Sequence, residues 1–241
     1  MAGTASVEYS VSTWFQAVPP VPGPVRGAVL DQIVAMIDVL GGHRLRVAID
    51  GFTASGKTSL GHELARGLAL RGRPVFRASL DDFKRPWSDR HLYDRESGEG
   101  YYRNAFDSEA TYRLLLEPSG ASADGNVALC SIDPLTQIDH SAIRSSMPEN
   151  GILVVDGVFA LRPEFNDYWD FRIWIDIDPE LSVTRGVGRD AGVVGDVEGA
   201  EKLHRDRYLV GELLYIAEVS PRAFVDVIVD NTDIAQPRLL A

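Results

Sequence analysis

A ten-residue stretch, GFTASGKTSL (51–60), limits what this chain can fold into more than any other part of its sequence. Gly51, Gly56, Lys57 and Thr58 match the pattern G-x-x-x-x-G-K-[ST], in which a backbone loop surrounds phosphate. The apolar run RVAID precedes the stretch, and TSLGHELARGLAL, with leucines spaced along one helical face, follows it. A strand, a glycine-rich loop and a helix in this order predict a phosphate-binding loop in an α/β domain.

Each residue type in this loop has a chemical reason to be there. Glycines let the backbone curl so that its N–H groups face the phosphates. Lys57 is expected to reach the β- and γ-phosphates, and the Thr58 hydroxyl is expected to bind Mg²⁺. The full set of expected nucleotide contacts is Gly51, Thr53, Ala54, Ser55, Gly56, Lys57, Thr58 and Ser59.

The rest of the sequence repeats the alternation of strand and helix. Five short apolar runs, separated by helical or irregular segments, occupy residues 45–50, 74–80, 151–157, 171–177 and 225–231. This alternation predicts a three-layer α/β sandwich with a five-stranded parallel sheet and helices on both faces. The run NVALCSIDP (126–134) is a candidate sixth strand at the edge of the sheet.

The organisation along the chain indicates one domain. Residues 1–24 end in VPPVPGP and are expected to be extended and loosely held, and 25–241 are expected to form a single domain. Helical periodicity predicts a helix over about 25–40, ended by two glycines. Residues 83–140 are too long for one crossover and predict a substrate-side insertion.

Composition excludes several classes of protein. The 241 residues carry a formal net charge of −11, which argues against a nucleic-acid or anionic-membrane partner. No apolar run is long enough to span a bilayer, and the N-terminus lacks a signal-peptide layout, so we expect a cytoplasmic protein. The one cysteine, Cys130, lies in an apolar stretch and is expected in the core.

Three acidic positions follow predicted strands. Asp156 ends the strand GILVVD, where a carboxylate could hold Mg²⁺ beside the loop; the alternative is a cap of the next turn. Asp81 and Asp82 follow the second strand, at the sheet edge where ligands of open α/β sheets bind. A carboxylate there could accept the proton of an attacking hydroxyl, or the pair could form a solvated turn.

Two arginines, Arg185 and Arg189, are four residues apart and would share one helical face. They could stabilise charge on a transferred phosphoryl group, or they could form an ordinary solvated face. Further upstream, Asp178 followed by Pro179 predicts a helix that begins with Asp178 as its N-cap.

Taken in order, these segments resemble the uridine kinase-like branch of P-loop kinases, which includes uridine, nicotinamide riboside and type I pantothenate kinases. The matching pieces are GFTASGKTSL, SLDDF, AFDSEA, VVDGVFAL, RGVGRD, RYLVG and VIVDN, spread over about residues 47–231. The loop is specific to the superfamily, and SLDDF with a downstream R-x-x-x-R-D narrows the resemblance to this branch.

The resemblance implies roles for particular residues. Asp81 would be the general base, Asp156 would join Thr58 in holding Mg²⁺, and Arg185 and Arg189 would belong to a lid at about 180–208. The expected catalytic residues are therefore Asp81, Lys57, Arg185 and Arg189. The candidate acceptor-binding residues of this chain are Asp82, Phe83, Tyr101, Tyr102 and Asp133.

The sequence departs from uridine kinases on the acceptor side. GYYRN places Tyr101 where the family has an aspartate near the ribose, and SIDPLTQIDHSAIR places Gln137 where the family has a base-reading histidine. Tyr101 and Tyr102 could stack on a ring or bond a sugar, or they could pack within their loop.

The resulting expectation is a phosphotransferase with an alcohol group as acceptor. It would use ATP and Mg²⁺ and act on a small molecule, with a nucleoside as the leading acceptor. A sugar, pantothenate or another vitamin precursor is the nearest alternative, and a nucleotide-binding regulator is an alternative of a different class. The sequence distinguishes neither ATP from GTP as donor nor a monomer from a homo-oligomer.

Overall fold

The computed structural model describes residues 6–14 and 18–240. Its centre is a seven-stranded sheet with the order β1-β3-β6-β2-β7-β8-β9, in which all pairings are parallel except that of β9 with β8. In sheet order, the strands are β1 (Val7–Tyr9), β3 (Val75–Ser79), β6 (Ile152–Asp156), β2 (Leu45–Gly51), β7 (Phe171–Asp176), β8 (Val227–Asp230) and β9 (Arg238–Leu240).

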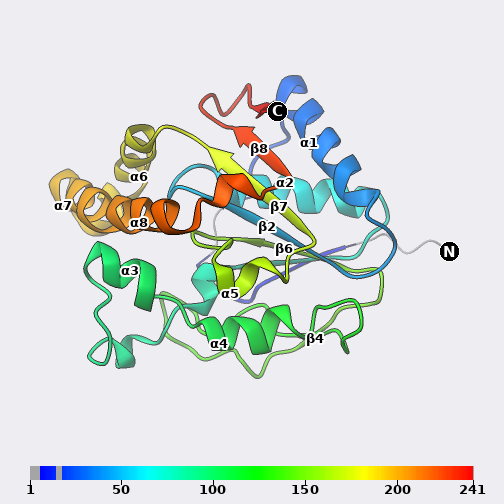
Figure 1. Cartoon of the computed structure of the whole chain (residues 1–241), viewed down its shortest axis with the longest axis horizontal. Coiled ribbons are helices and arrows are strands. Elements are labelled where there is room, and N and C mark those ends of the chain that lie inside the picture. The colour runs from blue at the N-terminus through cyan, green and yellow to red at the C-terminus, as the bar shows by residue number, and fades with distance from the viewer. Residues whose placement is uncertain (1–5, 15–17, 241) are drawn as a thin grey trace.

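Helices cover both faces of this sheet (Figure 1). On one face, α1 (Pro24–Asp38) and α2 (Lys57–Leu70) pack against alternate residues of the central strands, such as Val47 and Ile173. The other face carries α3 (Gly98–Asn104), α4 (Ser108–Thr111), the π-helical turn η3 (Tyr112–Leu116), α5 (Pro163–Asn166) and α8 (Val210–Val219). The predicted α/β sandwich is therefore confirmed, because strands buried on both faces need a helical layer on each.

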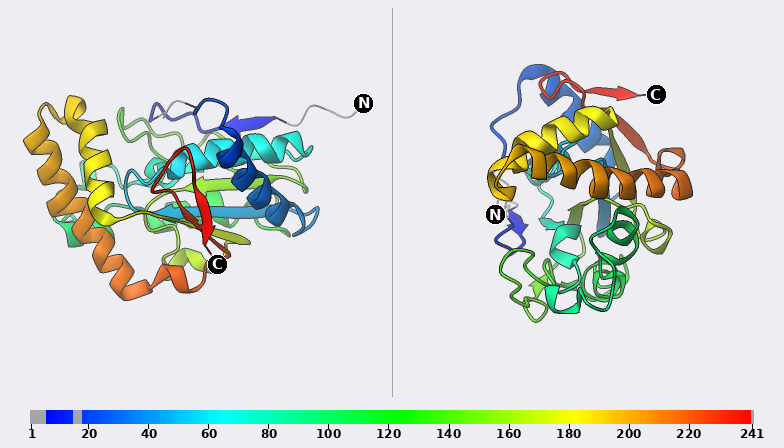
Figure 2. Two further views of the ribbon diagram at one scale, coloured as in Figure 1. Left: turned by 90° about the horizontal axis from the view of Figure 1, so that it is seen from above. Right: turned by 90° about the vertical axis from the view of Figure 1, so that its left-hand side faces the viewer.

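A helical hairpin projects from one end of the sheet. It consists of α6 (Pro179–Val194) and α7 (Val197–Lys202), and it continues through the π-helical segment η4 (Leu203–Leu209) into α8. Figure 2 shows α6 and α7 side by side, away from the sheet. Asp178 caps α6 by accepting a hydrogen bond from the Glu180 N–H, as the sequence predicts. Gly186 lets α6 lie close to the buried His204.

The sheet has more strands than the five predicted. All five are present, but β1 and β9 extend the sheet at its two edges. Each added strand has three residues, which is too short for an alternating pattern to stand out in the sequence. Val7 to Tyr9 pair with Val75 to Arg77, so the described part of the N-terminal segment is held rather than loose. Residues 1–5 and 15–17 of that segment lie outside the described residues.

The prediction of a sixth strand of the central sheet at 126–134 is wrong. Only Asn126–Val127 (β4) is a strand, and it pairs with Ser145–Ser146 (β5) in a separate two-stranded sheet. The apolar residues that suggested a sheet strand are buried instead under the insertion, where Ala128 and Leu129 belong to the core cluster of that face. Cys130 is also buried, as expected.

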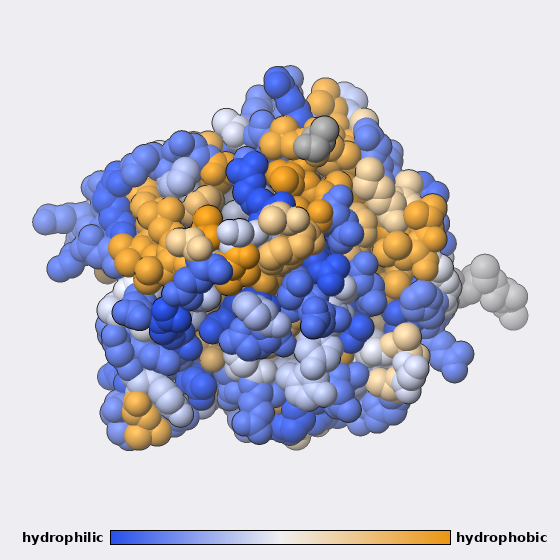
Figure 3. Space-filling view, viewed as in Figure 1, coloured by the Kyte–Doolittle hydropathy of each residue, from blue (hydrophilic) through white to orange (hydrophobic). Residues whose placement is uncertain are grey.

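Figure 3 shows that the hydropathy of the surface differs between two regions of this face. Polar side chains cover the layer that contains α3 and α4, whereas apolar side chains gather over α6 to α8. Val210 and Leu213 of α8 are among the exposed apolar residues. Within the described residues, no helix is long and apolar enough to cross a membrane.

A pair of leucines on α2 tests the core described above. Leu64 is fully buried between α2 and the sheet, whereas Leu70 at the end of the same helix is 84% exposed. We expect Leu64→Ala to lower the free energy of unfolding by about 2–5 kcal/mol, because it leaves a cavity in a close-packed layer. Leu70→Ala should change it by no more than about 0.5 kcal/mol. Urea unfolding of both variants measures this, and equal effects would contradict the packing.

Candidate active site

The loop between β2 and α2 has the conformation that its glycines allow. Gly51 and Gly56 have φ angles of +144° and +100°, a region that favours glycine. A Cβ atom on Gly51 would lie 2.5 Å from the Ile175 carbonyl oxygen, and one on Gly56 would lie 2.6 Å from Nδ2 of Asn231. The loop therefore depends on glycine at both positions, and α2 points its N-terminus at the space inside the loop.

Lys57 lies at the centre of this loop. Its ammonium group is buried and donates hydrogen bonds to the carbonyl oxygens of Gly51 and Phe52, at 2.8 and 2.7 Å. Burial lowers the Lys57 pKa, and the carboxylates of Glu212 and Asp50 oppose that shift. The loop thus fixes the ammonium group of Lys57 beside the space that would receive the phosphates.

The predicted metal ligands lie side by side. Thr58 donates a hydrogen bond of 2.6 Å to Oδ2 of Asp156 at the end of β6. The other Asp156 oxygen, Oδ1, is 2.7 Å from the buried guanidinium of Arg77, which fixes the carboxylate. A hydroxyl and a carboxylate oxygen suit Mg²⁺, which takes few protein ligands and uses substrate phosphates and water for the rest.

One further observation fits a phosphate ligand in this loop. The buried Ser55 hydroxyl has no hydrogen-bond partner within the described residues, although it belongs to the loop. A phosphate oxygen bound in the loop would give this hydroxyl an acceptor.

Asp81 lines the same cleft as the loop, in the 3₁₀ turn η1 (Leu80–Phe83) that follows β3. The Ser79 side chain caps this turn by accepting a hydrogen bond from the Asp81 N–H. Burial raises the Asp81 pKa, but Lys84 at 2.6 Å, with Lys57 and Arg189 further away, brings it below its ordinary value. Asp81 is therefore ionised near neutral pH.

One cleft of about 340 Å³ brings most of the predicted residues together. The strand order explains this convergence, because the carboxyl ends of neighbouring parallel strands meet at one edge of the sheet. Those that line the cleft are Thr53, Ala54, Gly56, Lys57, Thr58, Ser59, Asp81, Tyr101, Asp156, Arg185 and Arg189.

Both arginines of α6 border the cleft and have protein partners. Arg185 donates to the carbonyl oxygens of Asn231 and Thr232, at 3.1 and 2.8 Å. Arg189 forms a two-pronged contact with Asp190, at 2.6 and 2.8 Å. Asp190 also contacts His204, so Arg189 is fastened to the helical hairpin at the cleft although its side chain is 39% exposed.

Four of the five predicted acceptor residues lie outside the cleft lining: Asp82, Phe83 and Asp133, described here, and Tyr102, described below. Asp82 turns inward and accepts a hydrogen bond of 2.7 Å from Ser10, and burial raises its pKa to about 7. Phe83 is fully buried in the core. Asp133 is also buried and accepts hydrogen bonds from the backbone N–H and hydroxyl of Thr13, at 2.5 and 2.7 Å.

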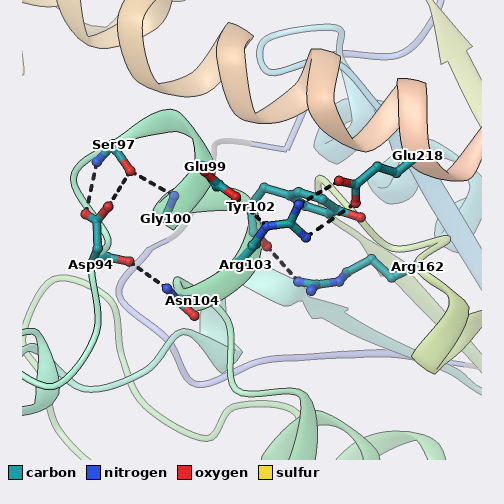
Figure 4. A network of polar contacts seen from close by, with 9 residues as sticks. All are labelled: Asp94, Ser97, Glu99, Gly100, Tyr102, Arg103, Asn104, Arg162 and Glu218. Carbon is teal, nitrogen blue, oxygen red and sulfur yellow. Dashed lines mark hydrogen bonds and ion pairs between the residues drawn. The ribbon is translucent and has the colours of Figure 1, made fainter.

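The two neighbouring tyrosines have different surroundings. Tyr101 borders the cleft, whereas Tyr102 lies in the network of Figure 4, with Arg162 and Arg103 over its ring at 5.0 and 5.4 Å. Arg103 also pairs with Glu218 of α8 at 2.6 Å. In the same view, Asp94 and Ser97 hold the start of α3. This network fastens α3 to α8. Tyr102 therefore packs within the protein, which is the second of the two alternatives given for it above.

The sequence reasoning missed the residues that hold the loop from behind. Thr53 donates to Oε1 of Glu212 through its N–H and its hydroxyl, at 2.7 and 2.6 Å, and its carbonyl accepts from Ser182. Asp50 accepts hydrogen bonds from the Gly51 N–H and from the Tyr215 hydroxyl. Position relative to the loop could have indicated Asp50. Glu212 directly follows the matching piece RYLVG, but neither Glu212 nor Tyr215 belongs to a matching piece.

Known proteins resemble this chain in sequence and in fold. No protein-family model matches the chain. A uridine kinase of Staphylococcus haemolyticus is 27% identical over 147 residues, which span 60% of this chain and 67% of that relative. The chain thus matches about two thirds of the relative's length.

Two solved structures share the fold. One, described as a "possible uridine kinase" from Bacillus stearothermophilus, superimposes with a TM-score of 0.64 at 21% identity, over 84% of this chain and 98% of that one. A D-glycerate 3-kinase from Cryptococcus neoformans superimposes with a TM-score of 0.55 at 11% identity, over 89% of this chain and 98% of that one.

These findings confirm the resemblance to uridine kinase-like proteins. The chain is similar to uridine kinases and has the fold of P-loop kinases. The expected class of enzyme, a kinase-type phosphotransferase, is confirmed at the level of the relatives. Neither the acceptor nor the roles of single residues follow from them.

Glu212 predicts a pH-dependent stability. Burial raises its pKa to about 7, so the folded state favours the protonated carboxyl. The stability that this preference contributes is complete below the ordinary glutamate pKa and is lost as the pH rises through about 7. Glu212→Gln keeps an oxygen for Thr53 but cannot ionise.

We therefore expect the wild-type protein, without nucleotide, to lose stability between pH 5 and 8 relative to Glu212→Gln, as measured by urea midpoints. Glu149→Gln, at an exposed glutamate, serves as the control and should follow the wild type. Parallel curves for wild type and Glu212→Gln would contradict the assignment.

Proposed function

We propose that this protein is an ATP-dependent kinase that transfers the γ-phosphate to a hydroxyl of a small metabolite, with a nucleoside as the leading acceptor. The observation that carries the proposal is one cleft in which an ionised Asp81 shares the space with Lys57 and the Thr58–Asp156 pair. A base for a hydroxyl and a cradle for phosphate are the two halves of such a reaction.

On the donor side, the backbone of the loop and the N-terminus of α2 bind the phosphates of ATP. Lys57 contributes its charge at the β- and γ-phosphates, after exchanging its contacts with Gly51 and Phe52 for phosphate oxygens. Thr58 and Asp156 hold Mg²⁺, which neutralises charge on the phosphates when bound.

On the acceptor side, Asp81 accepts the proton of the attacking hydroxyl. Lys84 and the other nearby cations keep it ionised, and its place after β3 puts it in the same cleft as the loop. A positioned base of this kind contributes only when the acceptor is bound, which separates phosphate transfer from hydrolysis.

Arg185 and Arg189 complete the cleft from the α6 side. Their guanidinium groups stabilise charge on the phosphoryl group during transfer. Their present partners, the Asn231 and Thr232 carbonyls and Asp190, hold the side chains near the cleft before substrate arrives. Closure of the α6–α7 hairpin over the phosphates would exclude water.

The names of the relatives support a small molecule with a hydroxyl group as acceptor, but they name different acceptors. Their names include uridine kinase and D-glycerate 3-kinase. The sequence relatives named uridine kinase favour a nucleoside over a sugar or pantothenate. A cytoplasmic location suits the proposal, because ATP is supplied there and the thiol of Cys130 stays reduced.

The test is ATP consumption by the purified protein with Mg²⁺ against a panel of nucleosides, sugars, D-glycerate and pantothenate. Strong stimulation by uridine or cytidine would support the nucleoside. Stimulation only by a sugar, D-glycerate or pantothenate would support the proposed phosphate transfer with that compound, rather than a nucleoside, as acceptor. Tight ATP binding without stimulation by any member would contradict the proposal and favour a nucleotide-binding regulator.

Asp81→Asn tests the base. We expect acceptor-dependent turnover to fall by about 10²–10⁴-fold, because the amide cannot take the proton, with ATP affinity changed by less than about twofold. Asp167→Asn, at an exposed aspartate away from the cleft, serves as the matched control and should keep wild-type turnover. Turnover close to wild type in Asp81→Asn would remove Asp81 from this role.

A further inference from the structure

The N-terminal segment reaches the acceptor side of the cleft. After β1, residues 10–14 leave the sheet edge, and Trp14 lines the same cleft as Asp81 and Tyr101. Trp14 also borders a small neighbouring cavity with Thr58, where a residue of the nucleotide loop meets the N-terminal segment. A segment expected to be loosely held thus supplies part of the wall of the site.

Strand order identifies which substrate Trp14 faces. The sheet places β1 and β3 on one side of β2, which carries the phosphate loop, and β7 and β8 on the other. Asp81 follows β3 and Trp14 follows β1, whereas Arg185 follows β7. Trp14 therefore lies on the side of the proposed base, away from the side bordered by α6 and the end of β8.

Two buried carboxylates hold the segment in this position. Ser10 donates to Asp82, and Thr13 donates through its N–H and hydroxyl to Asp133, at 2.5 to 2.7 Å. The other Asp133 oxygen accepts from the N–H groups of Leu135 and Thr136, so this carboxylate is filled by protein donors. Burial by itself would raise the Asp133 pKa, but these hydrogen bonds to the charged form bring it below its ordinary value, so the carboxylate stays ionised.

Three aromatic side chains, those of Trp14, Tyr101 and Tyr208, line the cleft. Tyr101 and Tyr208 lie 4.9 Å apart between ring centroids, and both line the cleft with Trp14. The Tyr101 ring is buried, with Arg207 at 4.9 Å and Phe159 at 5.3 Å from its centroid, whereas Trp14 is only half-buried and offers the more accessible ring. Aromatic faces of this kind bind planar rings by stacking, with little dependence on the hydrogen-bonding groups of the ring.

From this placement we propose that Trp14 is an acceptor-binding residue and that residues 10–14 are a specificity element for an acceptor with a planar ring. The inference rests on the proposed kinase function. Ser10 and Thr13 are positioning residues, since they act through Asp82 and Asp133. The segment takes over recognition that Gln137 cannot supply, because Gln137 is held at the Trp87 N–H.

Kinetics of four variants test this, with uridine as the first acceptor probe and D-glycerate as a probe without a ring. We expect Trp14→Ala to raise the uridine KM roughly tenfold, the loss of one stacked ring, and to leave the ATP KM within about twofold. Trp14→Phe should restore most of the affinity. Thr13→Ala should raise the uridine KM by a smaller factor with kcat unchanged.

Trp87→Ala is the matched control, because Trp87 is 52% exposed and does not line the cleft. It should leave both KM values unchanged. A Trp14→Ala variant that behaves like Trp87→Ala would overturn the proposal. So would a lower uridine KM or a higher kcat in Trp14→Ala, since the segment would then obstruct the acceptor site.

A binding measurement separates this proposal from the kinase proposal. If no acceptor stimulates the wild-type protein, the proposed function fails, and tryptophan fluorescence with Mg²⁺ and ADP is titrated with uridine. A quench in the wild type that disappears in Trp14→Phe would still support ring binding at Trp14. No quench, or an equal quench in Trp14→Phe, would overturn it.

Discussion

A buried ammonium group, that of Lys57, is the charge around which the site is built. Burial disfavours its charged form, and Glu212, Asp50, Asp156 and Asp81 offset that cost. Each of these four acids comes from a different element of the fold, so the charge balance of the site depends on the tertiary structure as a whole. Removal of any one of them leaves the lysine less compensated in a low-dielectric environment.

The same arrangement connects the helical hairpin to the loop. Ser182 of α6 donates to the Thr53 carbonyl, and Glu212 of α8 accepts from the Thr53 N–H and hydroxyl. Ser182 lies in α6, near the start of the hairpin, and Glu212 lies in α8, beyond its end, so the two helices contact the same residue of the loop. A movement of α6 relative to α8 would disturb at least one of these contacts with Thr53.

The sequence predicted those parts of the site whose chemistry is local. The loop, the five central strands and the Asp178 cap each follow from residues close together in the chain, and the structure contains them. Glu212 and Tyr215 could not be found in this way, because their contacts with Thr53 and Asp50 span more than 150 residues. Short strands such as β1 were missed for a related reason, since pairing with β3, rather than their own pattern, makes them strands.

The acidic pair Asp81–Asp82 illustrates how tertiary contacts divide equal residues into different roles. Asp82 points into the interior, where burial raises its pKa to about 7 and Ser10 supplies a hydrogen bond. Asp81 keeps its cleft position, and Lys84, Lys57 and Arg189 hold its pKa below the ordinary value. Besides burial, the negative charge of Asp81 raises the pKa of Asp82, whereas the hydrogen bonds from Ser12 and Ser10 lower it, so the N-terminal segment influences the charge balance beside Asp81. The N-terminal strand thereby contributes to the chemistry of the cleft as well as to its shape.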